Sequence, residues 1–598
     1  MAARGRWLAR RRGLPVVTIE DAPLRSIAPG DPWPVGFLLD ATGVHFDGRA
    51  PSDAETAILA ATEDDTERAR AGIAFLQAHH LSKYNEGDST PLPGSYVLVV
   101  DQTASDASLL CAGRTEFLAM LGEARAAHPD EEIIILTHPE IASGRKQGHF
   151  RQSDLDANMR FVSGLTPWAA LSGASAVYCW SSQLGLDAIL AGLRPQSFGW
   201  PIWAGWGLSN DRQSFPRRIQ RSREQLFAGL YLHHARWIDP FRETATDFET
   251  AARQLLSRRD HACRTKKGAV LMSMSPWKRG FLRRFFVGDV SFAEADDAVR
   301  LAEKTGRPLI RWASRDGGLS VPNMQYMEDG FLRSVGLGAA LVPPASLIID
   351  DLGVHYDPSR ESRLERLISK AEPTPRAAAL GRAIIGAKVS KYNVGHHALD
   401  DLRARAAGRK IILVPGQVED DASVIYGAPG LGNADLLAQA RDLYTHDFLV
   451  YKPHPDVEAG LRLGVIDAQM ADYIARETNA AELLDLCDAV VTLTSLMGFE
   501  ALLRGKAVTC LGTPFYAGWG LTCDLAKTPA RRAARPSIDA LVQAALIDYP
   551  LYVDPVTGLG CGPEDILARL EARDPRLAKA RPAHRGVAEL LPFFKGLK

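Results

Sequence analysis

Residues 411–423 read IILVPGQVEDDAS: four apolar residues, a Pro-Gly turn and a run of acids that ends in Asp421. The same order appears at residues 96–108, YVLVVDQTASDAS, where only Asp106 of the three acids is kept. A short apolar run bounded by turn residues is typical of a buried strand. The chain therefore contains the same unit of strand and acid twice.

Other motifs recur in the same order along the chain. They pair as follows: Glu20-Asp21 with Glu328-Asp329, Ser82-Lys83-Tyr84-Asn85 with Ser390-Lys391-Tyr392-Asn393, His138-Pro139 with His454-Pro455, and Ala204-Gly205-Trp206-Gly207-Leu208 with Ala517-Gly518-Trp519-Gly520-Leu521. The offset between partners stays between 308 and 316. A register kept over this length indicates two modules of about 300 residues each.

Length and composition limit the classes of protein that are possible. A chain of 598 residues is too long for one core and suggests about four domains. The net charge of -1 gives no basic excess, so we predict no nucleic-acid partner. Seven cysteines without a CxxC pair favour a reducing cytoplasm and argue against a structural zinc. No apolar stretch is long enough to span a membrane.

Strand and helix patterns alternate within each module. Residues 411–414 and 448–451 are apolar runs, and residues 434–444 between them have a helical pattern. This alternation predicts an α/β fold with doubly wound sheets, in which ligands bind at the carboxyl ends of the strands. The motifs of the second half of each module follow such strands directly.

The acids at 419–421 are the first candidate site. Acidic residues at the start of a helix are often only caps, and in a single sequence that interpretation is favoured. Asp421 is nevertheless the one acid of the three that both modules keep, as Asp106 in the first. A solvated cap has no reason to retain one position, so we predict that Asp421 and Asp106 are functional.

A histidine between two prolines follows the next strand, in Lys452-Pro453-His454-Pro455. A lone histidine is more often structural, but the prolines fix the backbone and present the imidazole rigidly. The repeat at His138-Pro139 favours binding of an anion or donation of a proton.

Small hydroxyl residues at a predicted helix start are a third candidate. Ser495 and Glu500 have the counterparts Ser182 and Asp187. Backbone N–H groups at such a start bind phosphate, and an acid one to two turns along can reach a ribose hydroxyl. A capped helix without a ligand explains the pattern equally well. Glu328 and Glu20 precede a turn pattern, and their repetition suggests a second acid that faces the cleft.

With these residues in view, the chain resembles the bacterial capsule polysaccharide β-Kdo glycosyltransferases of the KpsC/LipA type. The strings that carry the resemblance are MEDGFLRS, SKYN, PGQVEDDAS, YKPHPD, TSLMGFEALLRGK and PFYAGWGL, and the match runs from about Glu20 to Pro555. The resemblance implies tandem duplicated GT-B modules, each of two Rossmann-like doubly wound domains. It also implies a retaining enzyme that uses CMP-Kdo to build an oligo-Kdo linker on lysophosphatidylglycerol for capsular polysaccharide.

The resemblance implies roles for the repeated residues. Asp421 and Asp106 would attack the anomeric carbon of Kdo or stabilise its cation. Glu328 and Glu20 would be acid/base groups toward the acceptor hydroxyl, and His454 and His138 would lie beside the phosphate or carboxylate of the donor. The nucleotide pocket would comprise Lys452, Ser495 and Glu500 in the second module, and Ser182 and Asp187 in the first.

The two modules are not equally complete. Only 19 residues precede Glu20, whereas about 60 residues lie between Gly268 and Glu328, so we expect the first module to lack the opening of its acceptor-side domain. Lys452 becomes Leu136, and Phe515-Tyr516 becomes Ile202-Trp203. We expect the boundaries 1–90 and 91–265 for the acceptor-side remnant and nucleotide-sugar domain of the first module, and 266–405 and 406–598 for the second.

Several expectations concern partners and alternatives. We expect no metal site in the protein, although a divalent cation can stabilise the donor, and a cytoplasmic chain at the inner membrane, beside the capsule assembly and export machinery. The tail, residues 581–598, either lies on an anionic membrane surface or docks on the core as a helix. The alternatives are a non-catalytic scaffold of the capsule machinery and a GT-B enzyme that uses another nucleotide sugar, such as a UDP-sugar.

Overall fold

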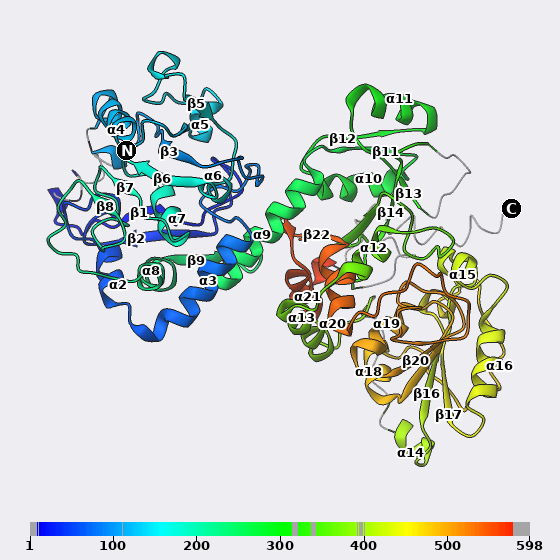
Figure 1. Cartoon of the computed structure of the whole chain (residues 1–598). Coiled ribbons are helices and arrows are strands. Elements are labelled where there is room, and N and C mark those ends of the chain that lie inside the picture. The colour runs from blue at the N-terminus through cyan, green and yellow to red at the C-terminus, as the bar shows by residue number, and fades with distance from the viewer. Residues whose placement is uncertain are drawn as a thin grey trace. The chain divides into compact units, whose positions relative to one another are not determined.

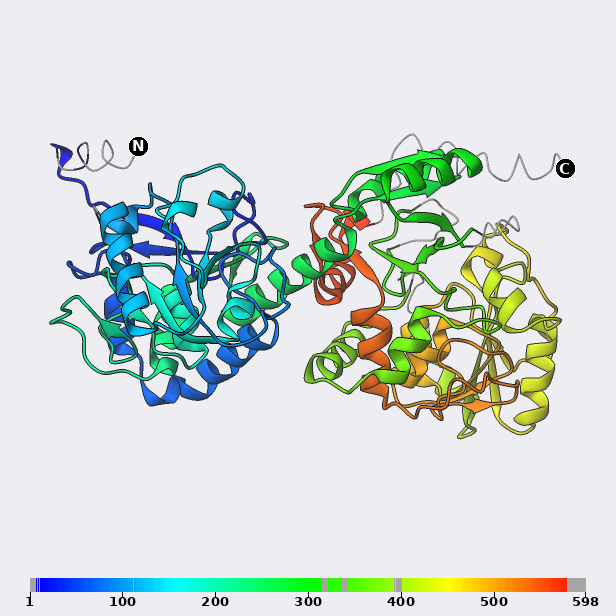
Figure 2. The same cartoon turned by 45° about the horizontal axis from the view of Figure 1, so that its top comes forward.

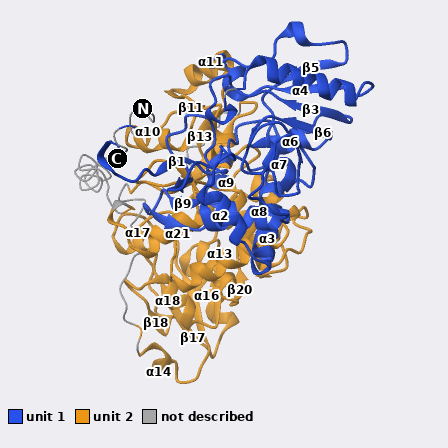
Figure 3. Cartoon of the chain, turned by 90° about the vertical axis from the view of Figure 1, so that its left-hand side faces the viewer, with its two compact units in different colours: residues 1–259 blue, residues 260–598 orange. Residues whose placement is uncertain are grey.

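The computed structural model describes residues 7, 9, 11–110, 112–313, 321–335, 342–391, 393, 399 and 401–577. The tail at 581–598 and Tyr392 of the repeated SKYN motif therefore lie outside the described residues. The chain divides into two compact units, residues 1–259 and 260–598 (Figure 3).

A six-stranded parallel sheet forms one half of unit 2, with the strand order β18-β17-β16-β19-β20-β21. Its strands are β16 (Ile411–Pro415), β17 (Phe448–Lys452), β18 (Tyr473–Ile474), β19 (Ala489–Thr492), β20 (Ala507–Cys510) and β21 (Cys523–Asp524). Numbered along the chain, this is the order 3-2-1-4-5-6 of a Rossmann-like sheet. The two central strands, β16 and β17, are buried along their whole length, as the apolar runs predict.

Helices cover both faces of this sheet. They are α15 (Ala422–Gly427), α16 (Asn433–Leu443), α17 (Pro455–Glu458), α18 (Ala480–Leu486) and α19 (Leu496–Leu503). Figures 1 and 2 show α16 on one side of the sheet and α18 and α19 on the other. The strand order reverses between β16 and β19, which is where ligands bind in doubly wound sheets.

Unit 1 contains the same sheet in the order β5-β4-β3-β6-β7-β8. Its strands are β3 (Tyr96–Val100), β4 (Ile133–Leu136), β5 (Met159–Val162), β6 (Ala174–Cys179), β7 (Gln196–Ser197) and β8 (Asn210–Asp211). Its helices are α4 (Arg114–Ala127), α5 (Pro139–Ala142), α6 (Pro167–Leu171) and α7 (Leu184–Leu190). The duplication predicted from the motifs is thus confirmed in the fold.

The second sheet of unit 2 has seven strands, in the order β12-β11-β13-β14-β15-β22-β23. They are β11 (Ala269–Met272), β12 (Val290–Ala293), β13 (Leu309–Trp312), β14 (Gln325–Asp329), β15 (Ser346–Asp350), β22 (Leu551–Val553) and β23 (Gly560–Cys561). The first four strands of this order pair in parallel, and the pairs from β14 to β23 are antiparallel. The last two strands come from the end of the module, so the chain returns to this sheet after the Rossmann-like domain.

In unit 1 the corresponding sheet has four strands, in the order β1-β2-β9-β10. They are β1 (Thr18–Asp21), β2 (Gly36–Asp40), β9 (Arg236–Asp239) and β10 (Thr244–Thr246). They match β14, β15, β22 and β23 in order and in antiparallel pairing. The α/β prediction is confirmed, with this smaller sheet in the first module.

A helical layer closes each module. It comprises α2 (Asp53–Ala60), α3 (Thr66–Ala78), α8 (Arg223–Phe227) and the π-helix η4 (Ala228–His234) in unit 1, and α12 (Arg363–Lys370), α13 (Pro375–Gly386), α20 (Ile538–Val542) and the π-helix η6 (Gln543–Asp548) in unit 2. The other helices are η1 (Glu63–Asp65), η2 (Ala107–Leu109), η3 (Gln152–Asp154), α9 (Phe248–Thr265), α10 (Pro276–Leu282), η5 (Arg283–Phe285), α11 (Ala295–Thr305), α14 (Leu402–Ala406), α21 (Pro563–Glu571) and η7 (Pro575–Leu577). π-helical turns are rare, so their recurrence at matching positions is further evidence of duplication.

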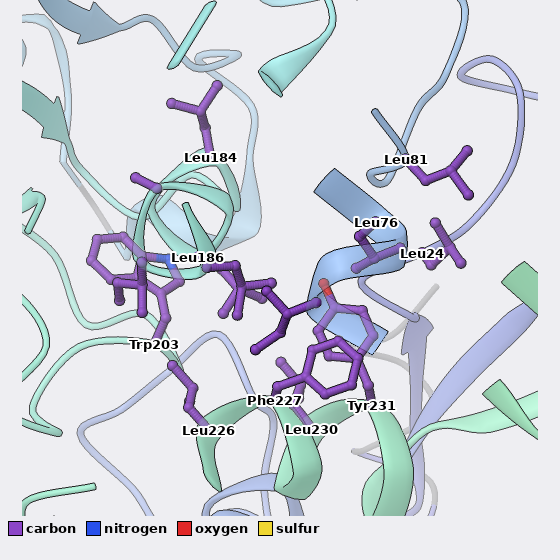
Figure 4. Close-up of a cluster of buried hydrophobic side chains, with 14 of the residues drawn as sticks. Leu24, Leu76, Leu81, Leu184, Leu186, Trp203, Leu226, Phe227, Leu230 and Tyr231 are labelled. Atoms are coloured by element: carbon purple, nitrogen blue, oxygen red, sulfur yellow. The ribbon is translucent and has the colours of Figure 1, made fainter. Parts of the chain in front are cut away.

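The core of unit 1 holds helix α7 in place. Figure 4 shows Leu184 and Leu186 of α7 in one buried cluster with Trp203 and with the residues of α8 and η4. Phe227 and Tyr231 stack with ring centroids 4.3 Å apart. Each such side chain contributes roughly 1.5–3 kcal/mol by its burial. This packing fixes the start of α7, which lies beside the predicted nucleotide pocket.

Candidate active sites

All six predicted residues of the second module line one cavity of about 350 Å³ in unit 2. They are Glu328, Asp421, Lys452, His454, Ser495 and Glu500. Glu328 comes from the seven-stranded sheet, and the other five come from the Rossmann-like domain at or after the ends of β16, β17 and β19. The cavity therefore combines groups from both sheets of the unit.

The five predicted residues of the first module line a cavity of about 890 Å³ in unit 1. They are Glu20, Asp106, His138, Ser182 and Asp187. Leu136 occupies the place that Lys452 takes in unit 2, and both side chains line their cavities. Burial lowers the pKa of Lys452, an effect that Glu458 opposes. The first site thus lacks one buried amine.

Asp421 is both a helix cap and a cavity residue. It directly precedes α15, and its Oδ1 accepts hydrogen bonds from the backbone N–H of Ser423 at 3.0 Å and from the Ser423 hydroxyl at 2.7 Å. Asp106 accepts the same two bonds from Ser108, at 2.9 and 2.8 Å. Among the described residues, neither Oδ2 atom accepts a hydrogen bond. One oxygen of each carboxylate is fixed, and the other can meet a ligand.

The two histidines have the same tautomer, because a backbone N–H donates to Nδ1 of each ring. For His454 the donor is Asp456 at 3.1 Å, and for His138 it is Glu140 at 3.2 Å. Burial lowers the pKa of His454 to about 4 and lowers that of His138 as well. Both rings are therefore neutral at pH 7, with the proton on Nε2.

The helix starts after β6 and β19 carry the predicted nucleotide pocket. Ser495 caps α19, and its carbonyl accepts a hydrogen bond from the Tyr516 hydroxyl. In unit 1 the carbonyl of Ser182 accepts instead from Nε1 of Trp203, at 3.0 Å. The change from tyrosine to tryptophan therefore preserves the support of the helix start.

The acids on these helices are deeply buried, and burial raises the pKa of both Glu500 and Asp187 to about 7. Glu500 accepts a hydrogen bond from the backbone N–H of Lys391 at 3.1 Å. The shorter Asp187 accepts from the Ser82 hydroxyl at 2.8 Å, and its Oδ1 has no partner among the described residues. A hydroxyl of a bound ligand would satisfy that oxygen.

Glu328 lies in strand β14, which ends at Asp329 directly before Gly330. The strand also carries Asp329, which pairs with Arg333 at 2.6 Å, and Asp21 pairs with Arg25 in the same way at 2.9 Å. Burial raises the pKa of Glu20; Lys83 lowers it, whereas Asp21 and Asp106 raise it. Glu20 is thus close enough to Asp106 for the two carboxylates to interact.

Several cavity residues were not singled out from the sequence. Lys391 and Lys83 line the two cavities, as do His355 and His45, whose pKa values fall to about 3 through burial. Lys83 and Lys391 belong to the repeated SKYN motif, so the signal was present. A lysine alone does not reveal a specific chemistry, which is why its role was not predicted.

Gln417 and Gln102 connect the strand ends of each site. Gln417 exchanges two hydrogen bonds with Thr494, both 2.9 Å long, and Gln102 does the same with Ser181 at 2.8 and 3.2 Å. These bonds hold the loop after the first strand against the loop after the fourth, where the strand order reverses. The two halves of each ligand pocket are thus joined directly.

The other acids and the Gly-Trp loops have structural roles. Glu419 accepts a hydrogen bond from the backbone of Asn433, and Asp420 pairs with Arg462. The indoles of Trp206 and Trp519 are buried and donate to the carbonyls of Ile202 and Phe515. The described residues of these loops, 204–208 and 517–521, are not among those that line the two cavities, and their buried indoles hold the turns together.

Within the described ranges, no helix is long and apolar enough to cross a membrane. The same part of the chain contains no group of three or more His, Cys, Asp or Glu side chains placed to hold a metal ion.

Comparisons with known proteins agree with the duplication. The profile of the capsule polysaccharide biosynthesis protein family matches residues 87–238 and 374–556, one match in each unit. The capsule polysaccharide modification protein LipA of Neisseria meningitidis is 36% identical over 93% of this chain and 84% of its own. The lipopolysaccharide-processing protein LpsZ of Rhizobium meliloti is 37% identical over 55% of this chain and 79% of its own. The structure of Thermosulfurimonas dismutans KpsC, a beta Kdo 2,7 transferase, is 32% identical over 51% of this chain and 98% of its own, with a TM-score of 0.42.

Proposed function

The chain belongs to the capsule polysaccharide biosynthesis protein family, and we propose that it is a retaining β-Kdo transferase that uses CMP-Kdo. One observation supports this most strongly: an aspartate with one unbonded oxygen, a neutral histidine and a buried acid line a cavity in each unit. The choice of Kdo rests on the ordered motifs, which resemble those of the β-Kdo transferases. The product would be the oligo-Kdo linker on lysophosphatidylglycerol.

The donor would bind through its phosphate at the start of α19. There Ser495 precedes the first helical residue, and backbone N–H groups and the helix dipole favour an anion. The Nε2–H of His454 and the amine of Lys452 would donate to oxygens of the phosphate or of the Kdo carboxylate. Glu500 would accept a hydrogen bond from the ribose. In unit 1, Ser182, His138 and Asp187 would do the same without the amine.

Transfer would take place in two steps with net retention. In the first, Oδ2 of Asp421 attacks the anomeric carbon, and the bond to the phosphate oxygen breaks so that CMP leaves with the electron pair. In the second, the acceptor hydroxyl attacks the same carbon, its proton passes to the Glu328 carboxylate, and Asp421 is released. Asp106 and Glu20 would play these parts in the first unit.

The lipid acceptor and the use of the product imply a location and further partners. We expect the enzyme to work at the cytoplasmic face of the inner membrane, in contact with the capsule assembly and export complex. Lys83 and Lys391 add positive charge to cavities that would admit an anionic acceptor. The donor needs no protein-bound metal in this proposal.

The test is transfer from CMP-Kdo, generated in situ, to a fluorescent lipid that carries one Kdo. The proposal predicts a longer product and release of CMP by the full chain. Parallel reactions with a UDP-sugar should give no product. If CMP-Kdo gives none either while CMP still binds, the scaffold alternative is correct and the proposal is wrong.

A further inference from the structure

Each site has a loop that brings a cation to its cavity. We call residues 143–149 and 459–465 the cation loops; they follow α5 and α17, and they carry Lys146 and Arg462, which line the two cavities. The loops match at an offset of 316. Each is joined to the loop after the first strand by one backbone bond, from Ala104 to Gln147 at 2.8 Å or from Glu419 to Leu463 at 3.3 Å.

In unit 1 a carboxylate fastens the cation loop. Asp101 directly follows β3 and is only 2% exposed, and its Oδ1 accepts a hydrogen bond from the backbone N–H of His149 at 3.0 Å. Gly148 lies so close that a Cβ there would overlap Oδ2 of Asp101. The carboxylate and the loop backbone are therefore in direct contact beside the cavity.

In unit 2 a neutral side-chain amide holds the cation loop, and this amide stands at a different position of the repeat from Asp101. The residue of unit 2 that corresponds to Asp101 is Gly416, and the Tyr451 hydroxyl packs against it. The side chain of Asn433, 1% exposed, donates to the carbonyl of Gly464 at 2.9 Å and to that of Gln417 at 2.8 Å. Its Oδ1 accepts from the backbone N–H of Gln417 at 2.8 Å.

We propose that Asp101 and Asn433 are positioning residues that hold Lys146 and Arg462 toward the anionic part of the donor, and that only the first site needs a charged group for this. That the anion is the donor rests on the proposed function. The bonds of Asp101 and Asn433 to the cation loops do not depend on it. Lys146 now pairs with Glu140 at 2.8 Å, and Arg462 with Asp420 at 3.0 Å. A bound anion would compete with these exposed pairs, which are weak in water.

The difference predicts that the first site is sensitive to mild acid. Burial raises the pKa of Asp101 to about 6, and the backbone bonds oppose this shift. Above that pH the carboxylate accepts strong hydrogen bonds from the loop; below it the protonated group accepts weaker ones and releases the loop. The amide of Asn433 does not titrate, so the second site should not respond in this way.

Two histidines, an arginine and an ion pair are other titratable or charged groups near Asp101. The ring of His149 stacks on Phe117 with centroids 3.8 Å apart, and burial lowers its pKa, so the ring takes up a proton less readily than a free imidazole. Arg114 donates to the His149 carbonyl and keeps its charge. Burial lowers the pKa of His138 as well, and the pair of Lys146 and Glu140 lies at the cavity.

Hydrogen exchange in the full chain tests the fastening without any substrate. Amides of residues 145–150 and 461–466 are compared at pH 5.5 and 7.5, corrected for intrinsic rates. We expect about tenfold loss of protection at the lower pH in the first loop only, because a hydrogen bond to a charged group is lost. Asp101→Asn should remove this dependence on pH. Asn433→Asp should deprotect the second loop at pH 7.5, where a carboxylate would face two carbonyls, and protection should partly return at pH 5.5.

Kinetics in the Asp421→Ala background, which leaves only the first site, test the link to the donor. Asp101→Ala should raise KM for CMP-Kdo about tenfold with kcat changed by less than about twofold. Equal responses of both loops to pH, or an unchanged response in Asp101→Asn, would overturn the proposal. If the loops respond to pH as predicted but the chain has no transferase activity, the proposed function is wrong. The role of Asp101 and Asn433 in holding the cation loops would then still be supported.

Discussion

At the scale of single residues, the two cavities are lined by the same kinds of side chain with small substitutions. The acid on the helix after the fourth strand is Glu500 in one site and Asp187 in the other, and each finds a different donor, the Lys391 backbone or the Ser82 hydroxyl. Burial of both acids in a cavity stores an unfavourable free energy when they are ionised. This energy can be measured.

Glu500→Gln should stabilise unit 2 at pH 8 but not at pH 5. Burial raises the pKa of Glu500 from 4.5 to about 7, so the folded chain binds a proton more tightly than the unfolded chain. The tighter binding of this proton adds to the free energy of unfolding below pH 4.5, and this gain is lost as the pH rises through 7. The loss in the free energy of unfolding amounts to roughly 3 kcal/mol. Thermal unfolding at both pH values checks this, with the exposed Glu571→Gln as control. Equal shifts at both pH values would contradict it.

The residues of the sites could be predicted because the chain carries two copies of each motif. Asp421 alone looks like a helix cap, and it is one; only its counterpart Asp106 indicated a further role. The fastening of the cation loops could not be predicted in this way. Asp101 and Asn433 do the same work from different positions, so the repeat conceals their equivalence.

At the scale of elements, close packing at the helix starts shapes the pockets. Gly498 in the first turn of α19 lies against the Tyr516 ring, and Gly185 in α7 lies against the Trp203 ring. Neither glycine has a positive φ, so close approach and not backbone conformation requires them. The aromatic ring that supports each helix start therefore also excludes a side chain there.

Gly498→Ala should destabilise unit 2, whereas Gly381→Ala should not. A Cβ at 498 would overlap the Tyr516 side chain, which is fully buried and cannot move aside. Overpacking of this kind costs about 1–3 kcal/mol. A Cβ at 381, in helix α13, meets nothing within 4 Å, and alanine there favours the helix. Denaturant unfolding of both variants checks the difference. Equal unfolding midpoints would contradict the prediction and show that the start of α19 can shift to make room for the Cβ.

Some elements could not be predicted from the sequence. Strand β14 was not predicted, because its polar residues Glu328 and Asp329 hide the alternation of a strand. The pairing of β15 with β22 joins residues about 200 positions apart, and local periodicity carries no information on such a pairing. The central parallel strands were predicted because burial on both faces makes them continuously apolar.

At the scale of the whole molecule, the chain is a duplicated unit, and each copy holds one of the two cavities that the predicted residues line. Among the described residues, those that line the first cavity belong to unit 1, and those that line the second belong to unit 2. Each unit thus holds its own copy of the predicted residues, except that the amine of Lys452 has no counterpart in unit 1. Loss of one catalytic carboxylate should silence one site and leave the other working.

The most direct test compares the products of Asp421→Ala, Asp106→Ala and the unchanged chain, with CMP-Kdo and a lipid acceptor that carries one Kdo. Mass spectrometry gives the number of sugars added, and the exposed Asp442→Ala and Asp130→Ala are the matched controls. We predict several added sugars for the unchanged chain and the controls, and extension that stops after one sugar or does not start in each site variant. Unaltered products in Asp421→Ala would contradict the role of this carboxylate, and with it the central claim that the repeated aspartate carries the transfer.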